Sequence, residues 1–216
     1  MLAGVRTMVK YPQGVSPFVN QADEKNWSQM QQPAKHRHRR GVDFSDRGMT
    51  LEQQLNESNK YYLAKGLAVV HKKPTPVQIV KVDYPKRSRA VIREAYFRQA
   101  STTDYNGVYR GYYLDFEAKE TRNKSCFPLK NFHPHQISHL QACLEQDGIC
   151  FTVLKFVTLE RYFIVPASIV IAAWKNPDHS SISLEEIISS SIELQCGYRP
   201  PLPYLDAVDR LIEGRK

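Results

Sequence analysis

The pattern of hydrophobic and polar positions divides the chain into an irregular first part and a longer part with regular periods. Residues 1–46 are rich in Gln, Pro, Asn and Ser and have no sustained apolar period, which is typical of a flexible arm. Regular patterns begin near Arg47, so we expect one folded domain over residues 47–216. The arm contains a compact basic cluster, Lys35–Arg40, which fits either a solubilising tail or an arm that contacts phosphates.

A capping box marks the first regular element. Thr50 is expected to cap a helix and Gln53 to reach back to it, with the helix continuing to about Lys65. Gly66 suits the position just after the helix. Leu67–His71 then has the composition of a short buried strand.

Residues 73–103 form a basic and aromatic excursion between two expected core strands. Two prolines, at 74 and 76, end the first strand, and Val77–Tyr84 is expected to be extended. The pattern over Ala90–Ala100 does not decide between helix and strand. The excursion contains many cations and aromatic side chains, namely Lys81, Lys86, Arg87, Arg89, Arg93, Arg98, Tyr84, Tyr96 and Phe97.

Alternating positions predict a hairpin next. Asn106–Gly107 is a turn signal, and the residues of Tyr112–Lys119 then alternate between two faces. One face would carry apolar side chains, and the other Tyr113, Asp115, Glu117 and Lys119.

The remaining periods predict two helices and two strands. Pro134 suits the first turn of a helix that runs to about Gln146, and Leu205–Ile212 has the pattern of an amphipathic helix. Ile149–Phe156 and Arg161–Val165 are expected strands. The order of elements predicts an α/β domain with a central mixed β-sheet flanked by helices.

The net charge of the chain indicates the class of partner that it binds. The 216 residues carry a net charge of +8, which favours a polyanion such as nucleic acid over an anionic membrane surface. The four cysteines match no zinc template or disulfide scaffold. The sequence lacks a signal-peptide pattern, and its longest apolar stretch, Phe163–Trp174, contains a proline and is too short to span a bilayer. We therefore expect a cytoplasmic protein without membrane association.

Candidate chemistry lies in the expected hairpin. Asp104 and Glu117 are thirteen positions apart, so a hairpin can bring the start of one strand near the middle of its neighbour. Lys119 lies on the same face as Glu117, about 6–7 Å along the strand. Two carboxylates can hold Mg²⁺, and a nearby lysine can offset charge that develops on a phosphate. The alternative is that this pattern is a solvated strand face, with Asp115 as a rival acid or an outer-shell group.

A zinc site is the alternative to this magnesium site. His135 and His139 are four residues apart on an expected helix, a spacing that suits a zinc pair. The carboxylates favour a harder ion, and the histidines also fit an ordinary helix face or a phosphate contact.

These residues resemble those of a known nuclease family. The Asp104, Glu117 and Lys119 arrangement is similar to the PD-(D/E)xK core, although Thr103 stands where that motif has proline. Several further runs, in one order, resemble the bacterial RecU family: RGMTLE at 47–52, NExNKYYL at 56–63, HKKPTPVQIV at 71–80, YPKRS at 84–88, STTDYNG at 101–107, DFEAKET at 115–121 and FPLKNFHPHQ at 127–136. Residues 9–12 resemble the usual start of the family, so Met8 is the expected natural first residue.

The resemblance implies site residues. It implies a restriction-endonuclease-like core with a projecting stalk, and a Mg²⁺ site for which Mn²⁺ can substitute. The implied metal ligands are Thr102, Asp104, Glu117 and Gln136. Lys119 would stabilise the transition state, and Glu57 would be the helical acid, with a solvated helix carboxylate as its alternative. The residues expected to contact DNA are Arg47, Lys72, Lys86, Arg87, Tyr96 and Phe97.

The resemblance also implies an activity. It implies a homodimeric endodeoxyribonuclease that resolves four-way (Holliday) junctions in recombination and repair, that works at the nucleoid, and that also contacts a RecA-type recombinase. The alternatives are another repair nuclease with the same core, and a non-cleaving protein that binds junctions or modulates a recombinase.

Overall fold

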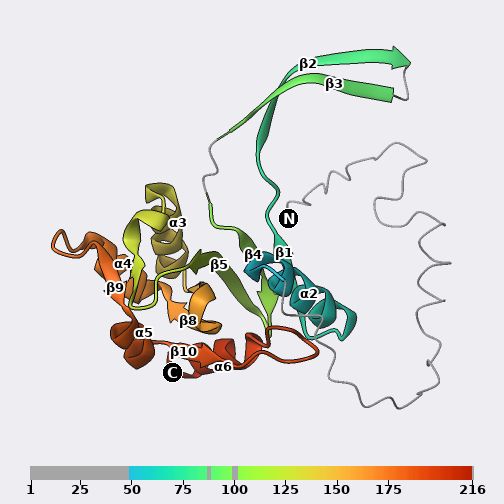
Figure 1. The fold of residues 1–216 in the computed structure, drawn as a ribbon. Coiled ribbons are helices and arrows are strands. Elements are labelled where there is room, and N and C mark those ends of the chain that lie inside the picture. The colour runs from blue at the N-terminus through green and yellow to red at the C-terminus, as the bar shows by residue number, and fades with distance from the viewer. Residues whose placement is uncertain (1–48, 87–88, 99–101, 216) are drawn as a thin grey trace, which may run out of the picture. The chain divides into compact units, whose positions relative to one another are not determined.

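The computed structural model describes residues 49–86, 89–98 and 102–215, which all belong to one compact unit, Phe44–Lys216. The arm expected over residues 1–46 lies outside the described residues. Element labels follow Figure 1.

A six-stranded mixed sheet forms the centre of the unit (Figure 1). The strand order is β1-β4-β5-β7-β8-β10, and neighbouring strands are antiparallel except for β5 and β7, which are parallel. The strands are β1 (Ala68–Lys72), β4 (Tyr105–Tyr109), β5 (Tyr112–Thr121), β7 (Ile149–Phe156), β8 (Arg161–Pro166) and β10 (Ile192–Leu194). The expected α/β class with a central mixed sheet is confirmed.

Helices cover both faces of this sheet with two separate apolar cores. They are α2 (Leu51–Ala64), α3 (Pro134–Glu145), α4 (Ala167–Lys175), α5 (Leu184–Ser190) and α6 (Leu205–Glu213). Leu55 of α2 and Val208 of α6 share one core with Phe116 of β5. Leu140 of α3 and Val170 of α4 belong to the core on the opposite face. The two-residue alternation of β5 therefore separates an apolar face from the polar face expected to carry the site.

Short elements complete the domain. A second small sheet pairs β6 (Cys126–Pro128) with β9 (Ser181–Ser183), and two short 3₁₀ turns are η2 (Leu129–Asn131) and η3 (Val157–Leu159). The apolar stretch Phe163–Trp174 is divided at Pro166, where β8 ends and α4 begins. Within residues 49–86, 89–98 and 102–215, no helix is both long and apolar enough to span a membrane.

The first helix begins where the capping box predicted. The Thr50 side chain accepts a hydrogen bond from the Gln53 N–H, and the Gln53 side chain accepts one from the Thr50 N–H. Gly66 follows the helix with a φ of 64°, a conformation that favours glycine. The N–H of Leu51 donates to the Glu120 carboxylate of β5 over 2.8 Å, so the start of α2 is fixed beside that strand.

The turn of the β4–β5 hairpin was predicted wrongly. Asn106 and Gly107 lie inside β4, and Arg110 and Gly111 form the turn, with φ angles of 50° and 84°. Two successive positive φ angles suit the twist of a two-residue hairpin. A Cβ on Gly107 would lie 2.2 Å from the Val69 carbonyl oxygen, so this glycine permits the close approach of β1.

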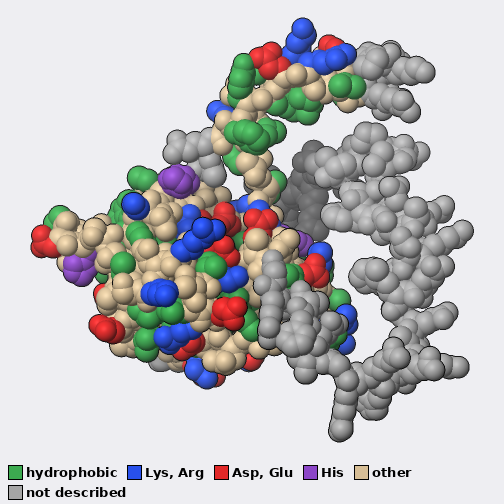
Figure 2. Space-filling model, in the orientation of Figure 1, with side chains coloured by type: hydrophobic (Ala, Val, Ile, Leu, Met, Phe, Trp, Pro, Cys, Tyr) green, Lys and Arg blue, Asp and Glu red, His purple; other side chains and the backbone are tan. Residues whose placement is uncertain are grey.

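Residues of the expected excursion form a separate two-stranded sheet, β2 (Val77–Lys86) with β3 (Arg89–Phe97) (Figure 1). The segment left open between helix and strand is thus a strand up to Phe97. Apolar side chains on both strands are exposed, including Ile79, Ile92 and Phe97, the last at 83%. Figure 2 shows such hydrophobic side chains among charged ones along this hairpin.

Candidate active site

The register of the β4–β5 hairpin brings Asp104 and Glu117 together. Tyr105 pairs with Phe116, so one further step along both strands places Asp104 opposite Glu117. The N–H of Asp104 donates to Glu117 Oε2 over 3.1 Å. A turn four residues earlier would have placed Asp104 opposite Tyr109, so the observed turn is what assembles the two carboxylates.

A stacked row of aromatic rings supports this pair from the other face of the sheet. The Phe116 ring lies between those of Tyr105 and Phe151, with centroids 4.9 and 4.7 Å away. All three side chains are buried in the core beneath α2 and α6. Each ring comes from a different strand, so the row restrains β4, β5 and β7 where Asp104 and Glu117 project.

Glu117 is the most buried acid of the pair. Its side chain is 1% exposed, and its Oε1 lies 2.9 Å from Lys119 Nζ and accepts a hydrogen bond from Gln136 Nε2 over 2.5 Å. Burial, and next the negative charge of Asp104, raise the pKa of Glu117 to about 7, although Lys119 opposes the shift. The two carboxylates therefore repel each other in a site where an added cation would be stabilised.

Gln136 reaches this site because α3 begins beside β5. Pro134 occupies the first turn of α3, and Gln136 Oε1 accepts a hydrogen bond from the His133 N–H over 2.9 Å. The amide oxygen thus caps the helix while the amide nitrogen contacts Glu117. In this arrangement Gln136 holds Glu117 in place, and its role as a metal ligand stays a prediction.

Lys119 and Thr102 complete the group expected around the two acids. Lys119 is on β5, its side chain is 17% exposed, and its Nζ lies 5.7 Å from the centre of the Phe132 ring. Thr102 stands two residues before Asp104, and its hydroxyl donates to the Thr103 carbonyl over 3.3 Å. Asp104 Oδ2 accepts a hydrogen bond from a β5 backbone N–H, that of Ala118, over 3.4 Å.

The acid of α2 that lies near the site is Glu52, which the sequence reasoning missed. A surface depression contains Asp104 and Lys119 together with Glu52 and Lys72, and Lys72 Nζ lies 2.6 Å from Glu52 Oε1. Glu57 instead lines a different depression and pairs with Lys60 at 2.7 Å. Five residues turn a helix by about 140°, so Glu52 and Glu57 lie on different sides of α2.

The described residues among those expected to contact DNA lie beside the depression that contains Asp104 and at the end of β3. Lys72 borders the depression with Asp104, where a cation suits a phosphate near the carboxylates. Tyr96 and Phe97 are exposed at the end of β3, at 59% and 83%. Lys86 ends β2, and its side chain lies outside the described part of the structure, as do the residues at 47 and 87.

Asp115 is buried on the same face of β5 as Glu117 and belongs to a second polar cluster. Its carboxylate contacts Lys73 Nζ at 2.8 Å and accepts hydrogen bonds from the hydroxyls of Thr103 and Tyr113. Burial raises the pKa of Asp115, but the hydrogen bonds from Lys73, Thr103 and Tyr113 outweigh it and leave that pKa below its ordinary value. Asp115 is therefore a buried, charge-paired acid and not a solvated one.

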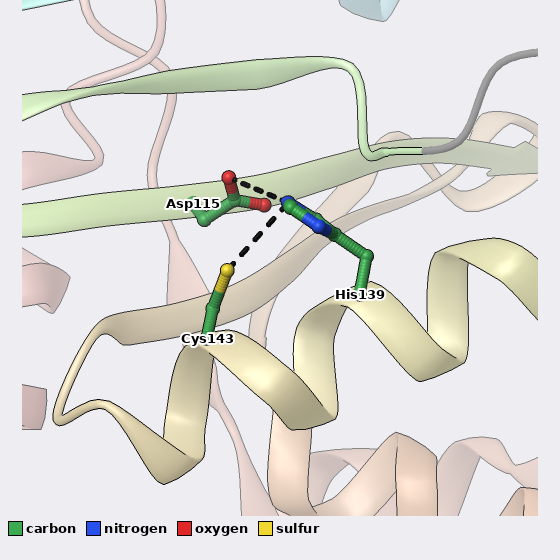
Figure 3. A group of neighbouring side chains, drawn as sticks. All are labelled: Asp115, His139 and Cys143. Carbon is green, nitrogen blue, oxygen red and sulfur yellow. Dashed lines mark hydrogen bonds and ion pairs between the residues drawn. The ribbon is translucent and has the colours of Figure 1, made fainter.

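The two histidines of α3 have different partners. His139 Nε2 lies 3.1 Å from Asp115 Oδ2, while the His135 ring stacks on the His133 ring with centroids 5.4 Å apart. Asp115 of β5 faces His139 and Cys143 of α3 (Figure 3). The ligand atoms of these three residues lie within 4.8 Å of one another. His139 thus joins a cluster with Asp115 and Cys143, and the zinc pair of His135 and His139, the less favoured of the two metal chemistries, stays an untested alternative.

The donor set beside Glu117 fits a hard divalent cation. Asp104 and Glu117 offer carboxylate oxygens from adjacent strands, which are the ligands that Mg²⁺ and similar ions prefer. Burial, and next the charge of Asp104, raise the pKa of Glu117, and a bound cation would offset both effects. Lys119 brings a positive charge to the same place, so the site can hold an ion and a phosphate together.

Comparisons with known proteins found a matching family model and similar proteins. The family model described as Recombination protein U, RecU, matches residues 46–210. A protein of Lactobacillus helveticus named Holliday junction resolvase RecU is 66% identical over 209 residues, which are 97% of this chain and 99% of that protein. Proteins with the same name from Lactobacillus acidophilus and Lactobacillus delbrueckii subsp. bulgaricus are 65% and 64% identical, over 97% of this chain and 99% and 97% of theirs.

Proposed function

This chain belongs to the RecU family, and on that premise we propose that it is a metal-dependent endonuclease that resolves Holliday junctions during recombination and repair. The observation that carries the proposal is the pairing of Asp104 with Glu117 across the hairpin, with Lys119 beside them. A protein that only bound junctions would have no use for two adjacent carboxylates, because they repel the phosphates that it must approach.

Asp104 and Glu117 would hold the ion, with Thr102 and Gln136 as further proposed ligands. When bound, the ion supplies Lewis acidity and neutralises charge at the phosphate. Lys119, held against Glu117 and Phe132, would stabilise the negative charge that develops on the phosphate. A water molecule would attack phosphorus in line and lose a proton to solvent. The bond to the 3′ oxygen would break and that oxygen would take up a proton, so that the products would carry a 5′-phosphate and a 3′-hydroxyl.

We propose Mg²⁺ as the natural ion, with Mn²⁺ as a substitute. Both suit carboxylate oxygens, and Mg²⁺ in particular is often bound by one or two carboxylates together with substrate phosphates. Asp104 and Glu117 supply that number of carboxylates, and the depression that contains Asp104 is also lined by Lys72 and Lys119, two cations that suit a substrate phosphate.

A homodimer is proposed because a four-way junction requires two nicks related by a two-fold axis. Two copies of this site in two-fold symmetry would cut strands of like polarity. Light scattering at concentrations that support cleavage should report a dimer, and a monomer there would contradict the proposal. Contact with a RecA-type recombinase, and work at the nucleoid in the cytoplasm, follow from the family resemblance and stay predictions.

The β2–β3 hairpin is proposed to bind the open centre of the junction. Its exposed apolar side chains include Tyr96 and Phe97, whose rings can stack on bases left unpaired at the crossover. Lys81 on the same hairpin is an exposed cation that can meet a phosphate, and Arg93, which pairs with Asp83 at 2.6 Å, would exchange that partner for one. These features favour a junction over a linear duplex, because only the junction presents both unpaired bases and converging phosphates.

The experiment is a cleavage assay on a synthetic mobile four-way junction and a linear duplex of matched sequence, with Mg²⁺ or with a chelator. We expect paired nicks in the junction in Mg²⁺ alone, and loss of cleavage with retained junction binding in Asp104→Asn. Glu213→Gln, at the exposed end of α6, is the matched control and should cleave normally. Equal cleavage of duplex and junction, or strong cleavage by the Asp104 variant, would reject the proposal.

A further inference from the structure

The two ends of the β2–β3 excursion meet at one buried carboxylate, that of Asp115. Lys73 precedes β2, and its Nζ lies 2.8 Å from Asp115 Oδ2. Thr103 follows β3, and its hydroxyl donates to Asp115 Oδ1. Lys73 Nζ also donates to the Thr103 hydroxyl over 2.9 Å, so the three groups form a closed ring. Asp115 is 0% exposed and Thr103 3%, while the Lys73 side chain is 17% exposed, so the carboxylate and the hydroxyl are buried and Lys73 lies at the edge of the ring.

The ring is directly connected to the backbone of Asp104. The N–H of Lys73 donates to the Asp104 carbonyl over 2.7 Å, and Thr103 is the residue that precedes Asp104. Asp104 is therefore held on one side by the chain that enters the excursion and on the other by the chain that leaves it. Asp115 and Glu117 are two positions apart on β5 and therefore lie on the same face of that strand. Asp115, which we call the anchor, is thus next to the carboxylate that faces Asp104.

Metal-ligand residue types surround Asp115, yet the protein supplies its own cation there. Asp115, His139 and Cys143 have ligand atoms within 4.8 Å of one another. The Lys73 ammonium lies 2.8 Å from Asp115 and 3.4 Å from His139, which is where a metal ion would have to approach them. A buried carboxylate with a well-placed lysine already has its charge compensated. The geometry therefore favours an anchor over a second metal site.

We propose that Asp115 is a positioning residue, which acts through Lys73 and Thr103 to fix Asp104 opposite Glu117 and to tie that geometry to both ends of the hairpin. The inference rests on the proposed function, because it assumes that Asp104 holds the ion. Removing the anchor should weaken metal binding while the exposed hairpin, and hence junction binding, is unchanged. Residues that orient metal ligands from behind commonly change metal affinity by about 10- to 100-fold.

The test compares two kinds of variant. Lys73→Met alone leaves Asp115 buried without its cation, so it is expected to fold poorly. The double variant Lys73→Met with Asp115→Asn removes both charges and relieves that cost, but it still lacks the anchor. Thr103→Val removes one hydroxyl, and Thr103→Ser restores it. Arg161→Met, which breaks an ion pair with Glu193 at the β8–β10 edge, is the matched control.

Mg²⁺ binding by the DNA-free protein is measured by calorimetry, junction binding in chelator by fluorescence anisotropy, and thermal stability by circular dichroism. We expect the double variant to melt near the wild type, to bind junctions within about threefold of it, and to bind Mg²⁺ about tenfold or more weakly. Thr103→Val should show a smaller loss that Thr103→Ser recovers, and Arg161→Met should show none.

Unchanged Mg²⁺ affinity in a folded double variant would overturn the proposal and leave a purely structural ion pair. Stoichiometric Zn²⁺ retention by the wild type, lost in Cys143→Ser, would also overturn it, because zinc would then replace Lys73 as the partner of Asp115. Mg²⁺ binding by a wild type that cleaves no junction would count against the proposed function, and the calorimetric comparison would still decide the positioning role.

Discussion

Replacing Glu117 by Gln should change how the stability of the metal-free protein depends on pH. Burial beside Asp104 raises the pKa of Glu117 to about 7 from its ordinary value of 4.5. Between these values the folded protein retains a proton that the unfolded chain has lost, so the free energy of unfolding falls as pH rises. Below about pH 4.5 both states are protonated, and above about pH 7 both are ionised. The Glu117→Gln variant has no carboxyl proton to lose and lacks this contribution.

The size of this change in the free energy of unfolding follows from the same pKa of Glu117. Each pH unit is worth about 1.4 kcal/mol per proton, so the interval from 4.5 to about 7 corresponds to a loss on the order of 3 kcal/mol in the wild type. Relative to the variant, the wild type should therefore lose about 3 kcal/mol of stability between pH 4.5 and pH 8. Other groups titrate in both proteins and cancel in the difference, provided that both unfold in two states.

Urea unfolding followed by circular dichroism, at steps between pH 4.5 and pH 8 in chelator, measures this difference. Glu213→Gln is the control, since its side chain is exposed and its curve should run parallel to that of the wild type. Mg²⁺ at pH 7.5 should then stabilise the wild type and leave Glu117→Gln little changed. Parallel curves for wild type and Glu117→Gln, or equal stabilisation of both by Mg²⁺, would refute the assignment of Glu117 as a buried ligand.

Three further outcomes are expected. Gly107→Ala should lower the free energy of unfolding by about 2 kcal/mol or more in urea melts, because its Cβ would lie 2.2 Å from the Val69 carbonyl oxygen; an unchanged midpoint would contradict the close strand approach. Lys119→Ala should slow single-turnover junction cleavage about 100-fold with little change in junction affinity, and the reverse pattern would make it a binding residue. Tyr96→Ala with Phe97→Ala should weaken junction binding by about 1–3 kcal/mol per stacked base and spare duplex binding, whereas equal losses would reduce the hairpin to a general basic surface.

Local signals in the sequence were sufficient for the helices and strands that carry the site, but not for α4, α5 or β10. The capping box at Thr50, the proline that opens α3 and the alternation of β5 each depend on a few neighbouring residues, and the structure confirms all three. The pair Asp104 and Glu117 could be chosen because one hairpin joins them, but the predicted turn would not have placed them opposite each other, and the observed turn at Arg110–Gly111 does.

Features that depend on contacts distant in sequence could not be predicted. Asn106–Gly107 has the composition of a turn, but Gly107 is required by the close approach of β1, and the local pattern predicts that strand without its pairing to β4. Glu57 was predicted as the helical acid of the site from the family resemblance alone. The pattern of α2 does not indicate which side of the helix faces the site, so it does not distinguish Glu57 from Glu52. Lys73 gave no signal at all, since its partner Asp115 is 42 positions away and a single lysine after a strand has no distinctive pattern.

The pairing of β1 with β4 has a consequence for how this enzyme can vary. Lys72 pairs with Tyr105, so the chain leaves the sheet and returns to it at adjacent positions. Everything between them is, in topological terms, one long loop, and the entropic cost of closing a loop grows only slowly with its length. Insertions or deletions there would change the reach of the hairpin without moving the strands that carry the carboxylates. The hairpin that is proposed to select the DNA structure can therefore diverge in evolution independently of the strands that carry the catalytic carboxylates.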